Sequence, residues 1–568
     1  MAQFFLRPVM VAALTLLTAL PVKAQDQFDA GAYLAARIAG SRDDFREASN
    51  WYTRALIADP SNSGLMEGAV IAHIAAGNYE AALAVARRLQ QSGAKSQPAD
   101  LILIADQAKR GDFSAMIADL DAGRSVGMLL DGLVRAWAEL GTGQMSDALE
   151  QFEKLAETKG LEAFGLYHKA LALASVGDFE GAEAILSGKD NGTINVRRRG
   201  TIAHIQILSQ LERNADALAL LNRALPIDTD PVVAAYKAKL EAGETLPYDI
   251  TRNVTDGIGE VFFTLSLALN GEASDSYTLL YSRITTWLRP DHFEAQLMSA
   301  SLLENQLQYD LAAEAYGMVP RTDGGFFAAE IGRARALNGA GRLEASLEVL
   351  TTLARDTPEL FSVHLALGDT LRRAERWPEA SAAYDKAVAL IPTAAANYWS
   401  VYFSRGISYE RQGKWTEAEA DFRKALELRP EEPQVLNYLG YSFLERGENF
   451  DEAIAMIETA VKARPDSGYI VDSFAWGLFL LGRYEESVEH MERASVLEPV
   501  DPIVTDHLGD VYWAVGRKLE ASFQWRRALS FGPEEDDAER IRRKLEVGLD
   551  AVRAEEGEKP LSEVQNAN

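Results

Sequence analysis

A stretch near the carboxyl end of the chain, residues 506–529, holds side chains whose types and spacing could do chemistry. It reads DHLGDVYWAVGRKLEASFQWRRAL and brings together one histidine, two aspartates, two tryptophans and a cluster of arginines. A histidine beside carboxylates can move protons, and aromatic residues among charges can bind a ligand or fill a core. The stretch therefore fits a catalytic pocket, a ligand groove or a packed scaffold, and the elements that position it decide among the three.

The rest of the chain lacks the other components of catalytic and metal sites. Of its seven histidines, none lies three or four residues from another, so the helical zinc spacing is missing. No G-x-S-x-G, Walker or G-x-G-x-x-G motif occurs in a strand–turn–helix context. We therefore expect no enzyme, no metal and no cofactor.

Charge and cysteine content narrow the classes of partner. The chain of 568 residues has 57 basic and 84 acidic residues, a net charge of −27, so its average surface repels nucleic acid. It has no cysteine, which excludes disulfides, thiolate metal sites and a lipid-accepting cysteine. The run Arg197 to Arg199 is either a local anion or partner patch or a solvated helix start, and the second interpretation is favoured in so acidic a chain.

The first residues have the pattern of an export signal. A positive charge at Arg7 precedes an apolar core at 9–20, and small residues lead to a cleavage site after Ala24. A retained anchor is the alternative, but a span needs about 20 apolar residues and this run stops at Pro21. The longest later apolar run, 260–269, predicts a buried helix, so we expect no transmembrane segment after removal of the signal.

Prolines in the second half recur with a period near 34 residues. The gaps between them are 34 to 38 residues, apart from one double step of 68, and the prolines are Pro290, Pro358, Pro392, Pro430, Pro465, Pro499 and Pro533. A fixed period of this length indicates a repeat architecture. A proline at the end of each period stops one helix and begins the turn into the next repeat.

Three columns of small residues and one column of large residues recur in register with these prolines. The small columns are Gly368, Gly406, Gly440, Ala475 and Gly509; Ala380, Ala418, Ala453, Ser487 and Ala521; and Ala387, Ala425, Ala460, Ala494 and Ala528. The large column is Tyr384, Phe422, Ile457, Met491 and Trp525. Small residues let two helices approach closely, and large neighbours fill the space beside them.

This pattern of small residues, large residues and prolines resembles the tetratricopeptide repeat, W-x2-L-G-x2-Y, A-x3-F, P, in which each repeat buries its apolar face against its neighbours. The resemblance implies an all-α fold, a tetratricopeptide superhelix or α-solenoid of antiparallel helix pairs. Weaker copies of the frame continue toward the amino terminus, and helix-breaking residues interrupt them once. The predicted parts are a signal peptide at 1–24, a degenerate repeat array at 25–230, an irregular joint at 231–258, a regular array at 259–535, a capping helix at 536–555 and a disordered tail at 556–568.

Three stretches, 436–447, 471–494 and 506–529, resemble a group of proteobacterial periplasmic and outer-membrane tetratricopeptide proteins. The group includes lipoprotein adaptors that deliver cell-wall hydrolases to carboxyl-terminal processing proteases. The resemblance implies an exported scaffold that binds proteins, with such a protease and its substrates as partners. In place of the adaptors' lipidated cysteine this chain has Ala24 and Gln25, so we expect a periplasmic protein that is peripheral to the outer membrane at most.

In tetratricopeptide proteins the first helix of each repeat lines a concave groove, and the resemblance carries this placement to the regular array. The implied partner-binding residues are Asn437, Tyr441, Asp472, Trp476, Asp506, Asp510 and Trp513. Aromatic side chains would supply contact area, the amide would hold backbone groups, and the acids would favour a basic partner. The alternative is that the tryptophans only pack between neighbouring helices.

Two other functions stay open from the sequence alone. The chain could be a structural or assembly factor for the outer membrane or cell wall. It could also be an enzyme or glycan-binding protein whose site lies in the irregular joint or the first half. A joint that packs as a complete domain would favour the latter interpretation.

Overall fold

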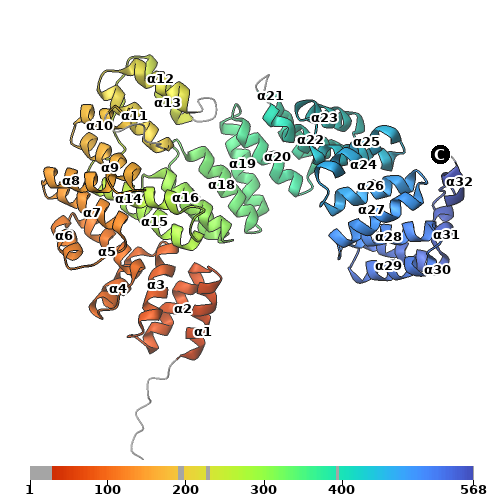
Figure 1. Cartoon of the computed structure of the whole chain (residues 1–568), viewed down its shortest axis with the longest axis horizontal. Helices are drawn as coiled ribbons and strands as arrows, with labels where there is room; N and C mark the ends of the chain where they lie inside the picture. The colour runs from red at the N-terminus through yellow and green to blue at the C-terminus, as the bar shows by residue number, and fades with distance from the viewer. Residues whose placement is uncertain (1–28, 190–196, 226–230, 392–395, 567–568) are drawn as a thin grey trace, which may run out of the picture. The chain divides into compact units, whose positions relative to one another are not determined.

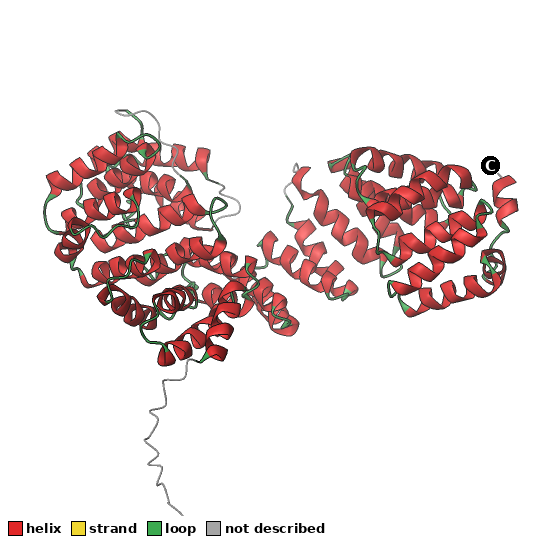
Figure 2. Cartoon of the chain, turned by 60° about the horizontal axis from the view of Figure 1, so that its bottom comes forward, coloured by secondary structure: helices red, strands yellow, loops and turns green. Residues whose placement is uncertain are grey.

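The computed structural model describes residues 29–189, 197–225, 231–391 and 396–566. The regular elements in these ranges are helices joined by turns and short loops, and the only bridge is an isolated pair between Asn270 and Ala273 (Figure 2). The chain forms two compact units, Met1–Ser346 and Leu347–Asn568. The predicted signal peptide, 1–24, lies outside the described residues.

The first unit consists of helices that pack against their neighbours in the chain, and its boundary falls inside the last of them (Figure 1). Its helices are α1 (Ala30–Ser41), α2 (Phe45–Ala58), α3 (Ser63–Ala75), α4 (Tyr79–Gln91), α5 (Gln97–Arg110), α6 (Phe113–Asp121), α7 (Met128–Gly141), α8 (Met145–Ala156), α9 (Glu162–Ser175), α10 (Phe179–Leu186), α11 (Arg198–Gln210), α12 (Asn214–Ala224), α13 (Pro231–Glu241), α14 (Val254–Leu269), α15 (Asp275–Leu288), α16 (Phe293–Asn305), α17 (Tyr309–Gly317) and α18 (Phe326–Gly339), followed by α19 (Leu343–Asp356), which continues past Ser346.

The second unit continues the pairing with more regular repeats. Its helices are α20 (Phe361–Arg373), α21 (Trp377–Ala389), the short 3-10 turn η1 (Ala396–Tyr398), α22 (Trp399–Glu410), α23 (Trp415–Leu428), α24 (Pro433–Arg446), α25 (Phe450–Ala463), α26 (Gly468–Leu480), α27 (Tyr484–Leu497), α28 (Pro502–Ala514), α29 (Lys518–Ser530), α30 (Glu535–Val547), α31 (Leu549–Glu555) and α32 (Leu561–Asn566).

The small and large columns of the sequence form the contact between the two helices of each repeat. All five members of the large column are fully buried, as are both alanine-rich small columns. A Cβ atom added to Gly440 would lie 2.7 Å from the Ile457 side chain and 2.9 Å from the Ala453 carbonyl oxygen. At Gly509 it would lie 2.4 Å from the Trp525 ring. The predicted close packing of antiparallel helix pairs is confirmed.

Local signals set the ends of the helices. The Asp501 carboxylate accepts hydrogen bonds from the backbone N–H groups of Ile503 and Val504, and Pro502 occupies the first turn of α28. At the other end of a helix, Gly447 adopts a φ of +69° after α24. Glycine takes this left-handed conformation without steric cost, which makes it a common helix terminator.

The first unit differs from an open repeat array because α14 and α15 lie against its inner helices. Helix α14 packs on α5, α7 and α9, and α15 packs on α3 and α5 (Figure 1). The ring of Trp137 on α7 fits against Gly257 so closely that a Cβ atom there would lie 2.3 Å from it. Helix α14 contains the predicted buried helix, and much of the helix is indeed buried. Helices α14 and α15 therefore cover the faces of α3, α5, α7 and α9 that they contact.

The division between the units corrects the predicted domain boundaries. The joint predicted at 231–258 and the beginning of the array predicted at 259–535 both lie inside the first unit. Between α13 and α14 the backbone is extended, and α11 holds it: Ser209 Oγ accepts from Leu246 N at 2.9 Å and Gln206 Oε1 from Asp249 N at 3.2 Å. The helix-breaking residues therefore mark a segment packed within a unit, and the segment is no separate domain.

The carboxyl end also differs from prediction. The expected capping helix, 536–555, is two helices, α30 and α31, separated at Gly548 with φ +86°. The tail expected to be disordered, 556–568, contains α32. Its Leu561 is buried, and the Leu561 carbonyl oxygen accepts a hydrogen bond of 3.0 Å from the Tyr484 hydroxyl. The tail also pairs with the preceding helices, since Glu556 accepts from Arg540 and the Lys559 carbonyl oxygen accepts from Arg553.

Candidate functional site

The predicted groove residues lie on the first helices of three successive repeats in the second unit, α24, α26 and α28. The structure divides them into two groups. Asp472, Asp506, Asp510 and Trp513 make specific contacts within the unit. Asn437, Tyr441 and Trp476 are half-buried and keep part of their surface exposed to solvent.

Asp506 and Asp510 do not face an open groove, which corrects the prediction for both. Helix α30 places Lys544 over them, and its Nζ donates hydrogen bonds of 2.7 Å to Oδ2 of each aspartate. Lys544 is 1% exposed and Asp510 is 0% exposed. Asp510 also accepts from Trp525 Nε1 at 2.9 Å. Burial raises the pKa of Asp506, against the opposing effect of Lys544.

The sequence did contain a signal for this contact. In α30 the residues Ile541, Lys544 and Leu545 have the three- and four-residue spacing of one helix face, and Ile541 is buried with Lys544. A lysine in the middle of an apolar face must meet an acid there. The sequence predicts a capping helix here, but the prediction did not include its buried charge.

Trp513 packs against the carboxyl-terminal helices, which again corrects the prediction of an open groove residue. Its Nε1 donates to Asp550 Oδ2 at 2.8 Å, and its ring lies 5.3 Å from the Trp525 ring, centre to centre. A Cβ atom on Gly548 would lie 2.5 Å from the indole. The side chain therefore holds the turn between α30 and α31.

Asp472, His507, Trp476 and Phe479 form a cluster across α26 and α28. His507 Nδ1 lies 3.0 Å from Asp472 Oδ1, and the His507 ring stacks on Trp476 at 4.0 Å with an interplanar angle of 12°. Phe479 stacks on Trp476 at 4.7 Å. Burial lowers the pKa of His507, but the adjacent Asp472, with Asp506 and Asp510, raises it above the ordinary value overall. The cluster favours a positive charge on His507.

Tyr441 and Asn437 on α24 continue the surface beside this cluster. Burial raises the pKa of Tyr441, and the carboxylates of Glu445 and Asp472 raise it further. Partial burial of its carboxyl group also raises the pKa of Glu445, although much of this side chain, at the end of the helix, is exposed to solvent. Among the described residues, the buried Oδ1 atom of Asn437 has no hydrogen-bond donor. An amide oxygen that is shielded from solvent without a donor is a point where a partner's N–H could bind.

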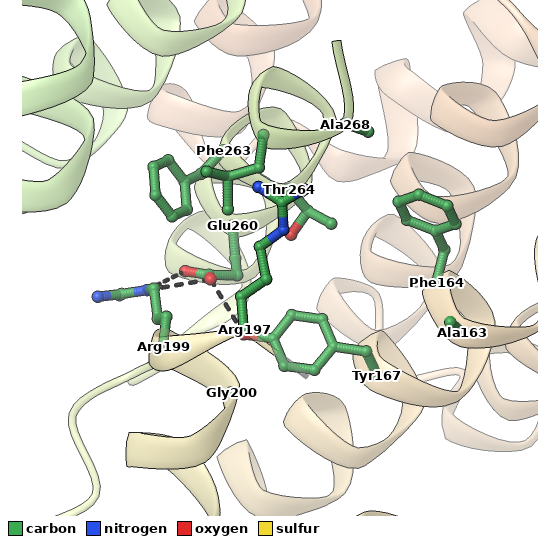
Figure 3. Close-up of a pocket in the computed structure, with 11 residues that line it drawn as sticks. Ala163, Phe164, Tyr167, Arg197, Arg199, Gly200, Glu260, Phe263, Thr264 and Ala268 are labelled. Carbon is green, nitrogen blue, oxygen red and sulfur yellow. Dashed lines mark hydrogen bonds and ion pairs between the residues drawn. The ribbon is translucent and has the colours of Figure 1, made fainter. Parts of the chain in front are cut away.

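In the first unit, the Arg197 to Arg199 run begins α11 and faces α14 (Figure 3). Arg199 Nε donates to both oxygens of Glu260, at 2.8 and 3.0 Å, and its Nη1 donates to Glu294 at 3.1 Å. Although burial favours the neutral acid, Arg199 and His292 hold the pKa of Glu260 well below its usual range. Arg198 also pairs with Glu294, at 3.2 Å. Two of the three arginines therefore join elements of this unit, which the sequence interpretations did not include.

Among the described residues, no group of three or more histidine, cysteine, aspartate or glutamate side chains is arranged so that it could hold a metal ion. Within the same residues, no helix combines the length and apolar character needed to cross a membrane.

A family model described as tetratricopeptide repeat matches residues 33–97, 331–395 and 403–468. No curated protein sequence matches the chain significantly. The matched repeats and the paired helices establish the fold as a tetratricopeptide α-solenoid, as predicted.

Several solved structures are similar to this chain in helical arrangement. The Cut9–Hcn1 hetero-tetramer of APC/C is 12% identical with a TM-score of 0.38, and the match covers 91% of this chain and 96% of that one. A tetratricopeptide repeat protein from Parabacteroides merdae is 16% identical with a TM-score of 0.37, covering 45% and 98%. Yeast Tom70 is 13% identical with a TM-score of 0.34, covering 93% and 96%. At these values the similarities carry no argument about activity or partner.

Proposed function

We propose that this chain is an exported tetratricopeptide scaffold that binds protein partners in the cell envelope, and that a partner segment lies along α24 and α26 of the second unit. The single observation that supports this site best is the buried Asn437 Oδ1 atom without a donor. It lies one helical turn from Tyr441, on the surface that the half-exposed Trp476 continues. A backbone N–H of an extended segment would satisfy the amide oxygen while its side chains contact the two aromatic rings.

Acidic residues around this surface favour a basic or mixed-charge segment. Glu445 is exposed beside Tyr441, and Glu410 on α22 accepts a hydrogen bond of 3.2 Å from Tyr438. Because exposed charges are screened by salt, association should weaken as ionic strength rises. His507, held by Asp472, reduces the negative charge at the other end of the surface.

Site-specific photocrosslinking in the source cells tests this location. A photoreactive residue at Tyr441 should capture a partner, and the same residue at Phe523, an aromatic position that is 54% exposed on α29, is the matched control. Asn437→Ala should reduce capture at Tyr441 at least threefold without changing the melting temperature. Trp476→Ala should reduce capture as much and also lower the melting temperature, because it removes the stacking on His507 and Phe479. Equal capture from Tyr441 and Phe523 would refute the site.

The finer role that we propose is an adaptor that presents substrates, such as cell-wall hydrolases, to a periplasmic carboxyl-terminal processing protease. The export signal and the sequence resemblance over 436–529 support it. Fractionation of the source cells should place the mature chain in the periplasm, with an amino terminus at Gln25. Added to the protease and a wall hydrolase, the purified chain should accelerate cleavage, and an unchanged rate would exclude the adaptor role.

The alternative role is a structural or assembly factor for the outer membrane or cell wall. The same surface would serve either role, so partner identity separates them. Capture of assembly components at Tyr441, with no effect of the chain on proteolysis, would favour this alternative.

A further inference from the structure

A pocket with mainly apolar walls lies between α9, α11 and α14 of the first unit, and none of its lining residues belongs to the surface proposed above for protein partners (Figure 3). Its volume is about 170 Å3. The lining residues are Ala163, Phe164, Tyr167, Arg197, Arg199, Gly200, Glu260, Phe263, Thr264, Leu267 and Ala268. A cavity of about 150 Å3 with apolar walls is large enough to hold benzene. This pocket therefore has room for one ring or a chain of about six carbons.

One positive charge in this pocket, that of Arg197, has no partner among the residues that the structure describes. The charged residues among the lining are Arg197, Arg199 and Glu260. Arg199 and Glu260 neutralise each other through hydrogen bonds of 2.8 and 3.0 Å, and the Tyr167 hydroxyl donates to the same carboxylate at 3.2 Å. No described residue forms a hydrogen bond or ion pair with the Arg197 guanidinium, which extends along the pocket toward Thr264 (Figure 3).

The surroundings of Arg197 favour an anion on independent grounds. Arg197 is the residue that precedes α11, and Gly200 in the first turn of that helix also lines the pocket. The amino-terminal end of a helix carries a partial positive charge. Glu260 already accepts hydrogen bonds from Arg199 and Tyr167, so its negative charge is largely compensated without Arg197. Arg197 is itself exposed to solvent, so an anion can reach its guanidinium while an attached apolar body enters the pocket.

We propose that this pocket binds a small apolar carboxylate whose body is one aryl ring or an alkyl chain of about six carbons. The body packs between Phe164 and Phe263, and the carboxylate pairs with the two-pronged guanidinium of Arg197. A neutral ligand of the same shape would leave Arg197 unpaired. A ligand with a positive charge would be repelled by it. The site is independent of the protein partner, so its failure would leave the proposed scaffold function unaffected.

Titration calorimetry on the mature full-length chain tests the ligand class with 3-phenylpropionate as the probe and 3-phenylpropionamide as its neutral isostere. We expect a Kd of about 1 mM or tighter for the acid, in line with the affinity per atom of small ligands. The amide should bind at least tenfold more weakly. Equal affinity for acid and amide, or no binding of the acid at 10 mM, would overturn the proposal.

Two variants locate the binding. Arg197→Gln should weaken binding of the acid at least fivefold and leave the weak binding of the amide unchanged. Ala268→Trp places a large ring at an exposed position on the pocket wall and should abolish binding of both compounds. Lys95→Gln is the control, because it removes one positive charge from an exposed loop between α4 and α5 that does not line the pocket. If Lys95→Gln weakens binding as much as Arg197→Gln, or Ala268→Trp leaves binding intact, the pocket is not the site.

Discussion

Lys544 places its ammonium nitrogen 2.7 Å from Oδ2 of Asp510 in the interior of the second unit. The same nitrogen reaches Asp506 at 2.7 Å, so one buried cation joins two carboxylates on α28 to the helix that follows the last repeat. Removing ions from water is costly, and the cost is offset only when each ion keeps its partners. The position of α30 therefore depends on this contact.

Lys544→Ala should destabilise the second unit by about 3–5 kcal/mol, because two buried carboxylates lose their hydrogen-bonded cation, and Arg540, 3.8 Å from Asp510, is too distant to donate a hydrogen bond in its place. The measurement is the free energy of unfolding in urea. Arg542→Ala on the same helix is the control: Arg542 is exposed and pairs only with Glu535, so its loss should cost less than about 1 kcal/mol. Equal effects of the two substitutions would show that the buried contact does not hold α30.

Gly440→Ala should destabilise the second unit by about 1–3 kcal/mol through overpacking. The added methyl group would approach the Ala453 carbonyl oxygen to 2.9 Å, and a backbone atom cannot move aside as a side chain can. Thermal unfolding measures the effect. Gln434→Ala, at an exposed position of the same helix, should leave the melting temperature within about 1 °C, and a similar loss in both variants would contradict the packing argument.

His507→Gln should reduce stability more at pH 5.5 than at pH 8.5. The pKa of His507 is raised in the folded chain because Asp472, Asp506 and Asp510 together outweigh its burial. A raised folded-state pKa gives stability that is fully present below the unfolded value of about 6.5 and is lost as the pH rises through the folded value. Unfolding free energies of both proteins at the two pH values give the difference. A difference that is constant with pH would mean that His507 does not bind its proton more tightly in the folded state.

Trp513→Ala should loosen α30 and α31 and cost roughly 2 kcal/mol, less than the loss of a fully buried tryptophan. The indole packs on Gly548 and binds Asp550, so its loss removes both contacts from the turn between these helices. Limited proteolysis should then cleave faster after residue 531. The control is Leu519→Ala, since Leu519 is 70% exposed on α29. Unchanged cleavage in Trp513→Ala would show that the indole does not hold this turn, and would favour the prediction that Trp513 lines an open groove.

The repeat packing could be predicted because it is local and periodic. Gly509 and Trp525 lie in one helix pair, 16 residues apart, and the same spacing separates Gly368 from Tyr384 and Gly406 from Phe422, so these contacts follow from sequence spacing alone. The same frame identified Trp525 as a core residue of the stretch 506–529, and the structure buries it completely. The groove positions Asn437, Tyr441 and Trp476 remain predictions that a binding experiment must test.

The contacts that the sequence did not predict involve helices outside the repeat frame. Asp510 occupies a groove position of its own repeat. The helix that covers it, α30, does not follow the repeat pattern, so the pattern could not predict which of its residues contacts Asp510. Helix α14 has repeats on both sides in the sequence, and yet it packs inward on α7. A pattern based on neighbouring repeats gives no information about contacts between helices more than a hundred residues apart. The pair between Arg199 and Glu260, 61 residues apart, likewise joins two helices that are not neighbours in the repeat frame.

The inward position of α14 and α15 gives the two units different folding behaviour. Lys109 on α5 donates a hydrogen bond to the Trp287 carbonyl oxygen of α15 across 178 residues of chain, so the first unit cannot be completed until distant segments meet. Such long loop closures slow folding and make it cooperative. In the second unit the helix contacts join near neighbours, so it can grow from any repeat and fray from its ends. Amide hydrogen exchange in the core of the first unit should therefore occur through one common unfolding event, with similar protection in all its helices. In the second unit, protection should increase gradually from the end helices to the middle ones.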